Sequence, residues 1–526
     1  MLRDLILVVI ARSGETEKGV SPLAVRQSDA KIGQFVAPWW VKNARKVTFA
    51  IAPAENCMKN QPSHLGTTKI SRLLLEYSVP AIIGTLITSL YNIIDSICIG
   101  HGVGSMALAG MALTFPIMNL SGAFGMLIGS GGTALVSIRL GENKKEEAEK
   151  ILANSLLLSL AIGIPFTFLS LYFLEEILVA FGGSQHSIPY AKEFLEVILA
   201  GTLISTLFYG FNNLLRASGH PRKAMVTMII SALINSILAP LFIFGFHWGI
   251  RGAAAATLIA QTAGAVWVMC HFWNPKNYLH FKWSQFQPQK KIIAGIVTLG
   301  LSPFLVQAAA SLVNATTNHT LELYGGDMAV GAFGIISRIL TLIVMVVMGL
   351  NQGLQPIVGY NYGAKQFSRV RRALSLGIGV AVAITSTGFV AAHLFPSGLT
   401  AIFTSDPLLK QYAANALKLG TLIYPIVGFQ IITSNFFLSI GKPRKAIFLS
   451  LSRQILFLIP AILLLPQWFG VNGVWLAMAL SDLLAAFTAA MVLGFQLRGF
   501  RQRMQQKRTV RNAEPSGAID PMGGLY

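Results

Sequence analysis

Twelve stretches of this chain are long enough and apolar enough to cross a lipid bilayer, and no other feature constrains its fold as strongly. A spanning helix needs about 20 mainly apolar residues, and breaks with Gly, Pro or charged residues separate the runs here. The runs cover residues 73–98, 106–138, 151–174, 191–215, 225–247, 252–272, 292–318, 328–356, 373–395, 411–438, 446–466 and 472–497. With 53% hydrophobic and 12% charged residues, the chain has more apolar surface than a soluble fold buries. We therefore predict an all-α, polytopic membrane protein with twelve transmembrane helices.

The charged residues indicate how these helices are oriented. The net charge is +20, but the basic residues are spread over short loops and a tail, which argues against nucleic acid as a partner. Loops on one side, together with the tail, hold 24 lysines and arginines, whereas loops on the other side hold four. Cytoplasmic loops carry the basic excess, so we expect a multi-pass protein of the inner (plasma) membrane with both termini in the cytoplasm.

The two ends of the chain differ from the apolar region between them. Residues 1–68 are mixed and polar and lack a convincing signal peptide, so we expect an N-terminal extension without a compact domain, and a natural start at Met58. Residues 498–526 form a basic tail. The three cysteines, Cys57, Cys98 and Cys270, suggest neither a disulfide framework nor a metal site.

An internal repeat appears when the chain is shifted by 222 positions. Asn92 then falls on Asn314, Gly141 on Gly363, and the run from Gly219 to Ala224 on the run from Gly441 to Ala446. Each half holds six spans, and an even number of spans returns the chain to its starting side. We therefore predict two parallel lobes, 69–285 and 286–497, related by an axis along the membrane normal, with a substrate cavity between them.

Asp95 lies inside the first apolar run. A carboxylate at such depth costs roughly 2.5–3.5 kcal/mol on insertion scales, so it usually faces the protein interior or a wet cavity and often binds an ion or proton. Asn92, three residues earlier, shares its helical face. We interpret Asp95 as a coupling-ion site. The alternative is a carboxylate that neighbouring hydroxyls or amides satisfy for helix packing alone.

The sequence offers no catalytic constellation. The nine histidines lack metal-ligand spacing, and neither a G-x-S-x-G motif nor an ATP-binding phosphate loop occurs. We predict that the protein is not an enzyme and uses no cofactor or metal. Transport would then be driven by an ion gradient, with H⁺ or Na⁺ as the coupling ion.

Several motifs resemble one transporter family. They are YNIID at Tyr91–Asp95, ALAGMALTFPI, GSGGTALVSIRLGE, LRASGHPRKA and, above all, NQGLQPIVGYNYGAK at Asn351–Lys365. Over residues 70–497 the chain resembles the MATE (multidrug and toxic compound extrusion) family, and its DinF-like and MepA-like branch in particular. The resemblance implies a twelve-helix, two-lobed antiporter that exchanges organic cations and other drugs for protons or sodium. It also implies that Asn235 and Thr257 are the partners of Asp95 in the cation site.

Two departures from the family pattern concern that site. Where many members of this branch carry a second carboxylate on the fifth span, this chain has Ala239, and Ser311 stands near the position of the acidic residue of NorM-like members. Coupling would then depend on Asp95, aided by Asn92, Asn235 and Thr257. The choice between H⁺ and Na⁺ stays open, with a lean towards protons.

We therefore expect an ion-coupled antiporter, a monomer in the bilayer, that exports small amphipathic, cationic compounds. Its substrate cavity would be lined, besides Asn92 and Asp95, by Tyr91, Asn213, Asn314, Gln352 and Gln355. One alternative is a flippase for lipid-linked precursors, for which Arg338 is the candidate cation, expected to be buried and needed for packing. The other is a membrane enzyme or structural protein that transports nothing.

Overall fold

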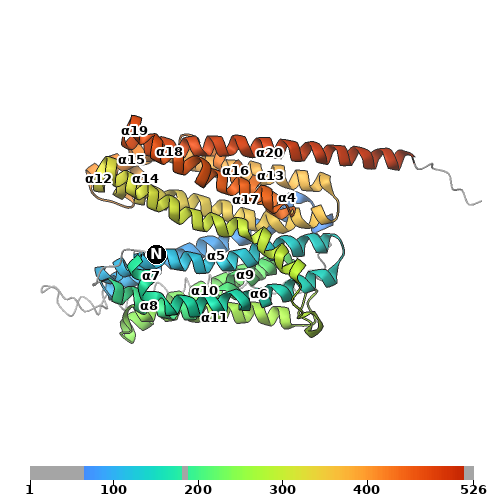
Figure 1. Cartoon of the computed structure of the whole chain (residues 1–526), viewed down its shortest axis with the longest axis horizontal. Coiled ribbons are helices and arrows are strands. Elements are labelled where there is room, and N and C mark those ends of the chain that lie inside the picture. Colours follow the sequence, from blue (N-terminus) through green and yellow to red (C-terminus); the bar gives the residue numbers. More distant parts are fainter. Residues whose placement is uncertain (1–63, 181–186, 514–526) are drawn as a thin grey trace, which may run out of the picture. The chain divides into compact units, whose positions relative to one another are not determined.

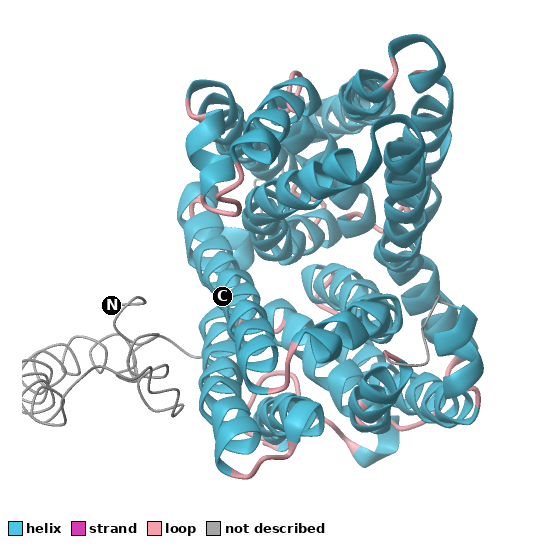
Figure 2. Ribbon diagram, turned by 90° about the vertical axis from the view of Figure 1, so that its left-hand side faces the viewer, coloured by secondary structure: helices cyan, strands magenta, loops and turns pink. Residues whose placement is uncertain are grey.

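The structure is a computed structural model that describes residues 64–180 and 187–513. The predictions for residues 1–63, including the start at Met58, and for 514–526 lie outside the described residues. Every regular element in the described ranges is helical, and Figure 2 shows the helices as two groups, one above the other.

The first group of helices, which we call the N-lobe, is coloured blue to green in Figure 1. Its elements are α4 (Ile70–Gly102), α5 (Ser105–Gly141), α6 (Lys145–Tyr172), α7 (Leu174–Ala180), α8 (Ile188–Ala200), α9 (Thr202–Ala217), α10 (Pro221–Pro240), the π-helical turn η1 (Leu241–Gly245) and α11 (Gly249–Trp273).

The second group, the C-lobe, is coloured yellow to red. Its elements are α12 (Lys290–Gly363), α13 (Phe367–Leu394), α14 (Pro396–Ala401), α15 (Pro407–Gly420), α16 (Pro425–Ser439), α17 (Pro443–Leu451), the π-helical turn η3 (Ser452–Leu458), α18 (Ile459–Leu464), α19 (Pro466–Phe469) and α20 (Val471–Ala513). A linker with the short helix η2 (Trp283–Gln285) joins the lobes.

The described helices provide the twelve predicted spans. Nine helical segments are long and apolar enough to cross a membrane, and two bent pairs, α8 with α9 and α15 with α16, form one span each, with bends of 56° and 57°. The 74 residues of α12 would extend about 110 Å as a straight helix. They turn back at Gly326, whose φ of 61° favours glycine, so α12 contributes two spans. The predicted fold class is thereby confirmed.

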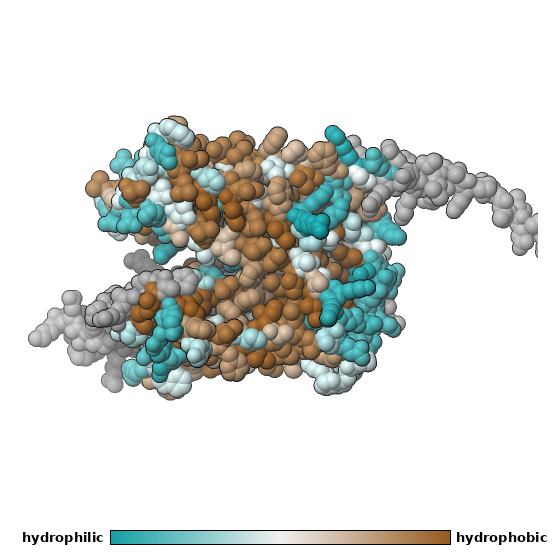
Figure 3. Space-filling view, viewed as in Figure 1, coloured by the Kyte–Doolittle hydropathy of each residue, from teal (hydrophilic) through white to brown (hydrophobic). Residues whose placement is uncertain are grey.

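The surface of the lobes fits a lipid environment. Figure 3 shows an apolar band across both lobes with polar residues at either end. Phe168, Leu394 and Phe487 are each about two-thirds exposed or more, which is unfavourable in water. Of the exposed tryptophans, Trp248, Trp273 and Trp468 lie at helix ends, where indole rings prefer the headgroup region. We call the end with loops 139–145, 216–223, 276–291, 364–372 and 442–445 the basic end.

At the basic end the lobes meet backbone to backbone. A Cβ atom on Gly141 would lie 2.0 Å from the backbone oxygen of Tyr360, and one on Gly363 would lie 2.1 Å from the backbone oxygen of Ile138. The 222-residue repeat converts one contact into the other, because Gly141 corresponds to Gly363 and Ile138 to Tyr360. Reciprocal contacts of this kind require a two-fold relation between the lobes. The internal repeat therefore has the parallel arrangement that we predicted.

Towards the opposite end the lobes part. One hydrophobic core, which includes Val136 of the N-lobe and Ile357 of the C-lobe, spans both lobes in the half near the basic end. In the other half, each lobe has buried clusters of its own, around Ile250 in the N-lobe and Trp475 in the C-lobe. Figure 3 shows the surface hollowed between the lobes on the left, at the end away from the basic loops. This hollow is where a substrate cavity between the lobes would open.

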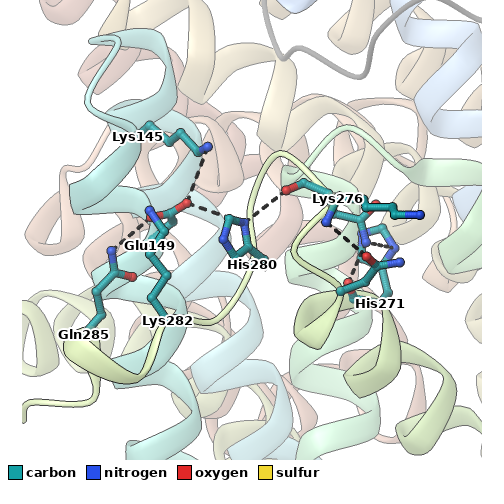
Figure 4. Close-up of polar contacts among 9 residues, drawn as sticks. Lys145, Glu149, His271, Lys276, His280, Lys282 and Gln285 are labelled. Atoms are coloured by element: carbon teal, nitrogen blue, oxygen red, sulfur yellow. Dashed lines mark hydrogen bonds and ion pairs between the residues drawn. The ribbon is translucent and has the colours of Figure 1, made fainter.

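The linker between the lobes is anchored on a buried acid of α6, Glu149 (Figure 4). Glu149 Oε2 lies 2.7 Å from Lys282 Nζ and accepts a hydrogen bond of 2.9 Å from Gln285 Nε2. Lys145 Nζ and His280 Nδ1 lie 3.7 and 3.8 Å from Oε1. The linker is therefore fixed to the N-lobe up to the start of the C-lobe.

The start of the described chain differs from our prediction in extent. Residues 64–67 form a helical turn, α3 (His64–Thr67), in which Leu65 is fully buried, so the extension predicted to reach residue 68 is part of the fold at its end. At the other end, α20 continues to Ala513, so the first part of the basic tail is helical.

Replacing Gly363 with alanine is expected to destabilise the protein by about 1–3 kcal/mol, because the added methyl group meets a backbone oxygen that cannot rotate away. The measurement is the unfolding temperature in detergent. Gly334→Ala is the control, since no atom lies within 4 Å of a Cβ there. Equal unfolding temperatures for the two variants would contradict the proposed close contact.

Replacing Glu149 with glutamine is expected to loosen the linker, because two lysines lose their counter-charge while a buried polar group remains. Limited trypsin digestion after Lys276 and Lys282 should then become several-fold faster than in the wild type. Glu146→Gln, an exposed change in the same helix, should leave the digestion rate unchanged.

Candidate functional site

Three helices of the N-lobe bring Asp95, Asn235 and Thr257 together. Thr257 Oγ1 on α11 donates a hydrogen bond of 3.2 Å to Asp95 Oδ2 on α4. Asn235 Nδ2 on α10 lies 3.4 Å from the same carboxylate oxygen and 3.0 Å from Thr257 Oγ1. Asn235 and Thr257 are buried, and Asp95 is half-buried. These are the partners that the family resemblance implied for Asp95.

Two oxygens of this group are buried and have no hydrogen-bond partner among the described residues, namely Asp95 Oδ1 and Asn235 Oδ1. Buried acceptors of this kind normally have a partner, and leaving one unpaired costs about 1–3 kcal/mol. A proton on Asp95, or a small cation, would use these oxygens. Carboxylate, amide and hydroxyl oxygens are also the donors that hard cations prefer. The described residues therefore suit a site for H⁺ or Na⁺.

Ala239 lies on the same side of α10 as Asn235. It lies one helical turn after Asn235, is fully buried and packs with Phe242 and Ala256. A methyl group thus occupies the place where the branch pattern has a second carboxylate, so Asp95 is the acid of this group. The π-helical turn η1 begins directly after Pro240.

A polar network continues from this group towards the basic end. Tyr91, one turn before Asp95 on α4, has its hydroxyl 3.4 Å from the hydroxyl of Tyr209 on α9. Gln261, one turn after Thr257, accepts a hydrogen bond from Ser205. Tyr209 and Gln261 supply polar contacts that the predicted site residues did not include. Tyr209 comes four residues after Ser205, and Gln261 four residues after Thr257, so each pair shares a helical face. This spacing was the signal in the sequence that could have identified them.

Asn92 and Asn314 do not join the Asp95 group, and both are exposed. On α4, Thr85 and Ser89 contact Met345 of the C-lobe, and Asn92 follows on the same helical face at the next turn. Asn92 therefore faces the hollow beyond the last contact between the lobes. Asn314 is its repeat counterpart and lies 14 residues after Gly300, on nearly the same face of α12, where a Cβ atom on Gly300 would lie 1.9 Å from the backbone oxygen of Leu127 of the N-lobe.

The remaining predicted cavity residues lie deeper. Asn213 accepts a hydrogen bond of 2.7 Å from Arg216 Nη1 and donates to the backbone oxygen of Tyr209, within the N-lobe. Gln355 is buried, and its Nε2 donates a hydrogen bond of 2.8 Å to the backbone oxygen of Ser130 across the contact between the lobes. Gln352 is half-buried. In this conformation, Gln355 thus belongs to the closed contact and not to the open hollow.

Three arginines within or beside apolar runs lie in different surroundings, and two of them differ from what the sequence suggested. Arg216, which we counted as a loop cation, is almost fully buried. Arg338 is exposed, so the expected need for a packing partner was wrong. Arg453, on η3, forms an ion pair of 2.6 Å with the buried Asp482 of α20. Hydropathy alone does not distinguish these environments, because each residue stands within or beside an apolar run.

Comparisons with known proteins agree with this arrangement. The family model MatE matches residues 80–241 and 303–463. The multidrug export protein MepA of Staphylococcus haemolyticus is 26% identical over 430 residues, which cover 81% of this chain and 94% of that protein.

Solved structures show the same fold. An outward-facing multidrug resistance MATE family transporter of the MOP superfamily has a TM-score of 0.79 at 24% identity, over 84% of this chain and 98% of its own. A MOP superfamily transporter from Pyrococcus furiosus, whose binding pocket has reverse polarity, has a TM-score of 0.80 at 24% identity, over 83% and 98% of the two chains.

The Arg453–Asp482 pair gives a prediction for the C-lobe. Asp482→Asn is expected to cost about 2 kcal/mol of folding free energy, because it leaves the guanidinium without its counter-charge. The double variant Arg453→Met, Asp482→Leu should be more stable than Asp482→Asn, since an apolar pair needs no compensation. Unfolding temperatures in detergent test this order, and a double variant less stable than the single one would contradict it.

Proposed function

Since this chain belongs to the MatE family, we propose that it exports small amphipathic, cationic molecules in exchange for H⁺ or Na⁺. The observation that carries this proposal is the Asp95 group, a half-buried carboxylate with two neutral polar partners and unpaired oxygens, beside the hollow between two duplicated lobes. A carboxylate in such surroundings can exchange its proton or cation, and the hollow gives a substrate room to bind.

In the proposed cycle, the lobes alternate between two arrangements. The described one is closed at the basic end and open at the other. We assign the basic end to the cytoplasm because of its excess of Lys and Arg, so the described arrangement faces outward. Binding of H⁺ or Na⁺ at Asp95 from outside would favour substrate release, and its loss to the cytoplasm would prepare the next cycle. The protein would act as a monomer in the inner (plasma) membrane.

The similarity to MepA, named as a multidrug export protein, supports drugs and toxic compounds as substrates. The hollow-facing positions Asn92 and Asn314 are neutral amides, with Ser89 one turn before Asn92 and Ser311 one turn before Asn314. Walls with neutral polar groups of this kind offer hydrogen bonds beside apolar contacts, so they suit amphipathic molecules and select loosely by shape.

Transport of lipid-linked anions has less support. A pyrophosphate group needs several cations, and among the arginines discussed above, Arg453 is neutralised by Asp482 and Arg216 is buried within the N-lobe. Arg338 is exposed on α12, seven residues before Met345 and so on the same helical face. One exposed arginine is a weak basis for holding a multiply charged head group.

The test is efflux of a fluorescent cation from cells that lack their own efflux pumps. Asp95→Asn keeps the size and polarity of the side chain but removes its charge, so efflux should fall at least tenfold. Asp327→Asn, an exposed change at the turn of α12, is the matched control and should transport normally. Collapsing the proton gradient and the sodium gradient separately identifies the coupling ion.

Wild-type rates in Asp95→Asn would remove this residue from the mechanism. Efflux that persists when both gradients are collapsed would contradict ion coupling. The flippase alternative would be favoured if the protein failed to export cations but moved lipid-linked anions, and if Arg338→Ala abolished that movement.

A further inference from the structure

We propose that two segments of the chain, residues 64–68 and 285–289, act as paired straps that hold the lobes together at the basic end. Each strap directly precedes the first helix of one lobe and is hydrogen-bonded to the other lobe. The inference rests on the proposed alternation of the lobes, since a strap matters only if that end opens.

The first strap precedes α4 of the N-lobe and is bound by the C-lobe. The backbone oxygen of Leu65 accepts hydrogen bonds of 3.0 Å from Asn361 Nδ2 and 3.0 Å from Arg369 Nη2. Arg369 Nη2 also donates to the backbone oxygen of Thr68 at 2.6 Å, and its Nε donates to Asn361 Oδ1 at 2.7 Å. The Leu65 side chain is fully buried. One guanidinium therefore ties the start of the N-lobe to α13.

The second strap precedes α12 of the C-lobe and is bound by the N-lobe. Asn154 of α6 is fully buried and donates through Nδ2 to the backbone oxygen of Gln287 at 3.2 Å. Its Oδ1 accepts a hydrogen bond of 2.8 Å from the backbone nitrogen of Gln289. Gln285 is held by Glu149 of the same helix. The last residues before the C-lobe are thus tied to α6.

The two straps are counterparts in the repeat. Shifting residues 64–68 by 222 gives 286–290, and the helices that bind the straps, α6 and α13, have bounds that differ by the same number at both ends. The hydrogen-bonding side chains are not equivalent, because Asn361 and Arg369 correspond to Arg139 and Glu147. The crossing of each strap to the other lobe is therefore common to both halves, although different residues make the bonds.

The straps bias the lobes towards the described arrangement. Parting the lobes at the basic end would draw α4 away from α13 and α12 away from α6, so bonds at 64–68 and 287–289 would be broken or stretched. Charged hydrogen bonds such as those of Arg369 are stronger than neutral ones. We therefore expect loss of the first strap to have the larger effect on the balance between the two arrangements.

The experiment measures the distance between the lobes by pulsed electron paramagnetic resonance on the full chain. Spin labels are placed at Arg222→Cys and Arg444→Cys, exposed counterparts in the basic loops of the two lobes, after Cys57, Cys98 and Cys270 are replaced with serine. In Arg369→Gln, the ratio of molecules at the longer label distance to molecules at the shorter distance should rise about tenfold. Asn154→Leu should raise it less. Arg371→Gln, an exposed change in the same helix, is the control and should leave it unchanged.

Asn361→Ala is a second variant, in case Arg369→Gln fails to fold. It removes the bond from Asn361 to Leu65 but keeps the positive charge of Arg369. It should raise the same ratio by a smaller factor. Unchanged distances in both variants would overturn the proposal. This outcome is separate from failure of the proposed function. Normal efflux in Asp95→Asn would refute ion coupling without affecting these distances, and a wild type that never populates the longer distance would refute alternation itself.

Discussion

The approach of two backbones at paired glycines is the constraint on which the rest of this structure depends. Gly141 and Gly363 each face a backbone oxygen of the other lobe at a distance that leaves no room for a side chain. Because the two contacts are reciprocal, they fix the axis between the lobes as well as their spacing. Contact in one half of the bundle leaves the hollow in the other half, and Asp95 lies just beyond the last contacts of α4 with the C-lobe.

The two lobes share a backbone arrangement but differ in the side chains at equivalent positions. The repeat counterparts of Asp95, Asn235 and Thr257 are Thr317, Phe457 and Ala479, which cannot form an equivalent site. Thr317 is buried and donates to the backbone oxygen of Val313 in its own helix. The C-lobe instead holds the Arg453–Asp482 pair, in which the two charges satisfy each other. Duplication thus gave two lobes of similar backbone, and the acid without a counter-charge, Asp95, lies in the N-lobe.

The sequence was sufficient for the features that the membrane itself imposes. Bilayer thickness sets the length of a span, so twelve apolar runs predicted the helices, and the 222-residue repeat predicted the parallel lobes. The family resemblance, and not spacing, paired Asp95 with Asn235 and Thr257. The sequence could not place Arg216 inside a lobe, Arg338 at the surface or Gln355 in the closed contact, because hydropathy does not say which neighbour fills the space around a side chain. The straps were missed for a related reason, since their bonds to the other lobe use backbone oxygens and a backbone nitrogen, groups that the sequence does not distinguish.

Ala239 has an electrical consequence. With one acid in the Asp95 group, the site gains or loses a single elementary charge as it exchanges its ion. If the proposed exchange is one for one, a monovalent substrate leaves as a monovalent ion enters, and no net current crosses the membrane. For such a substrate the voltage would neither drive nor oppose the cycle, whereas exchange of a neutral or a doubly charged substrate would move one net charge and be electrogenic.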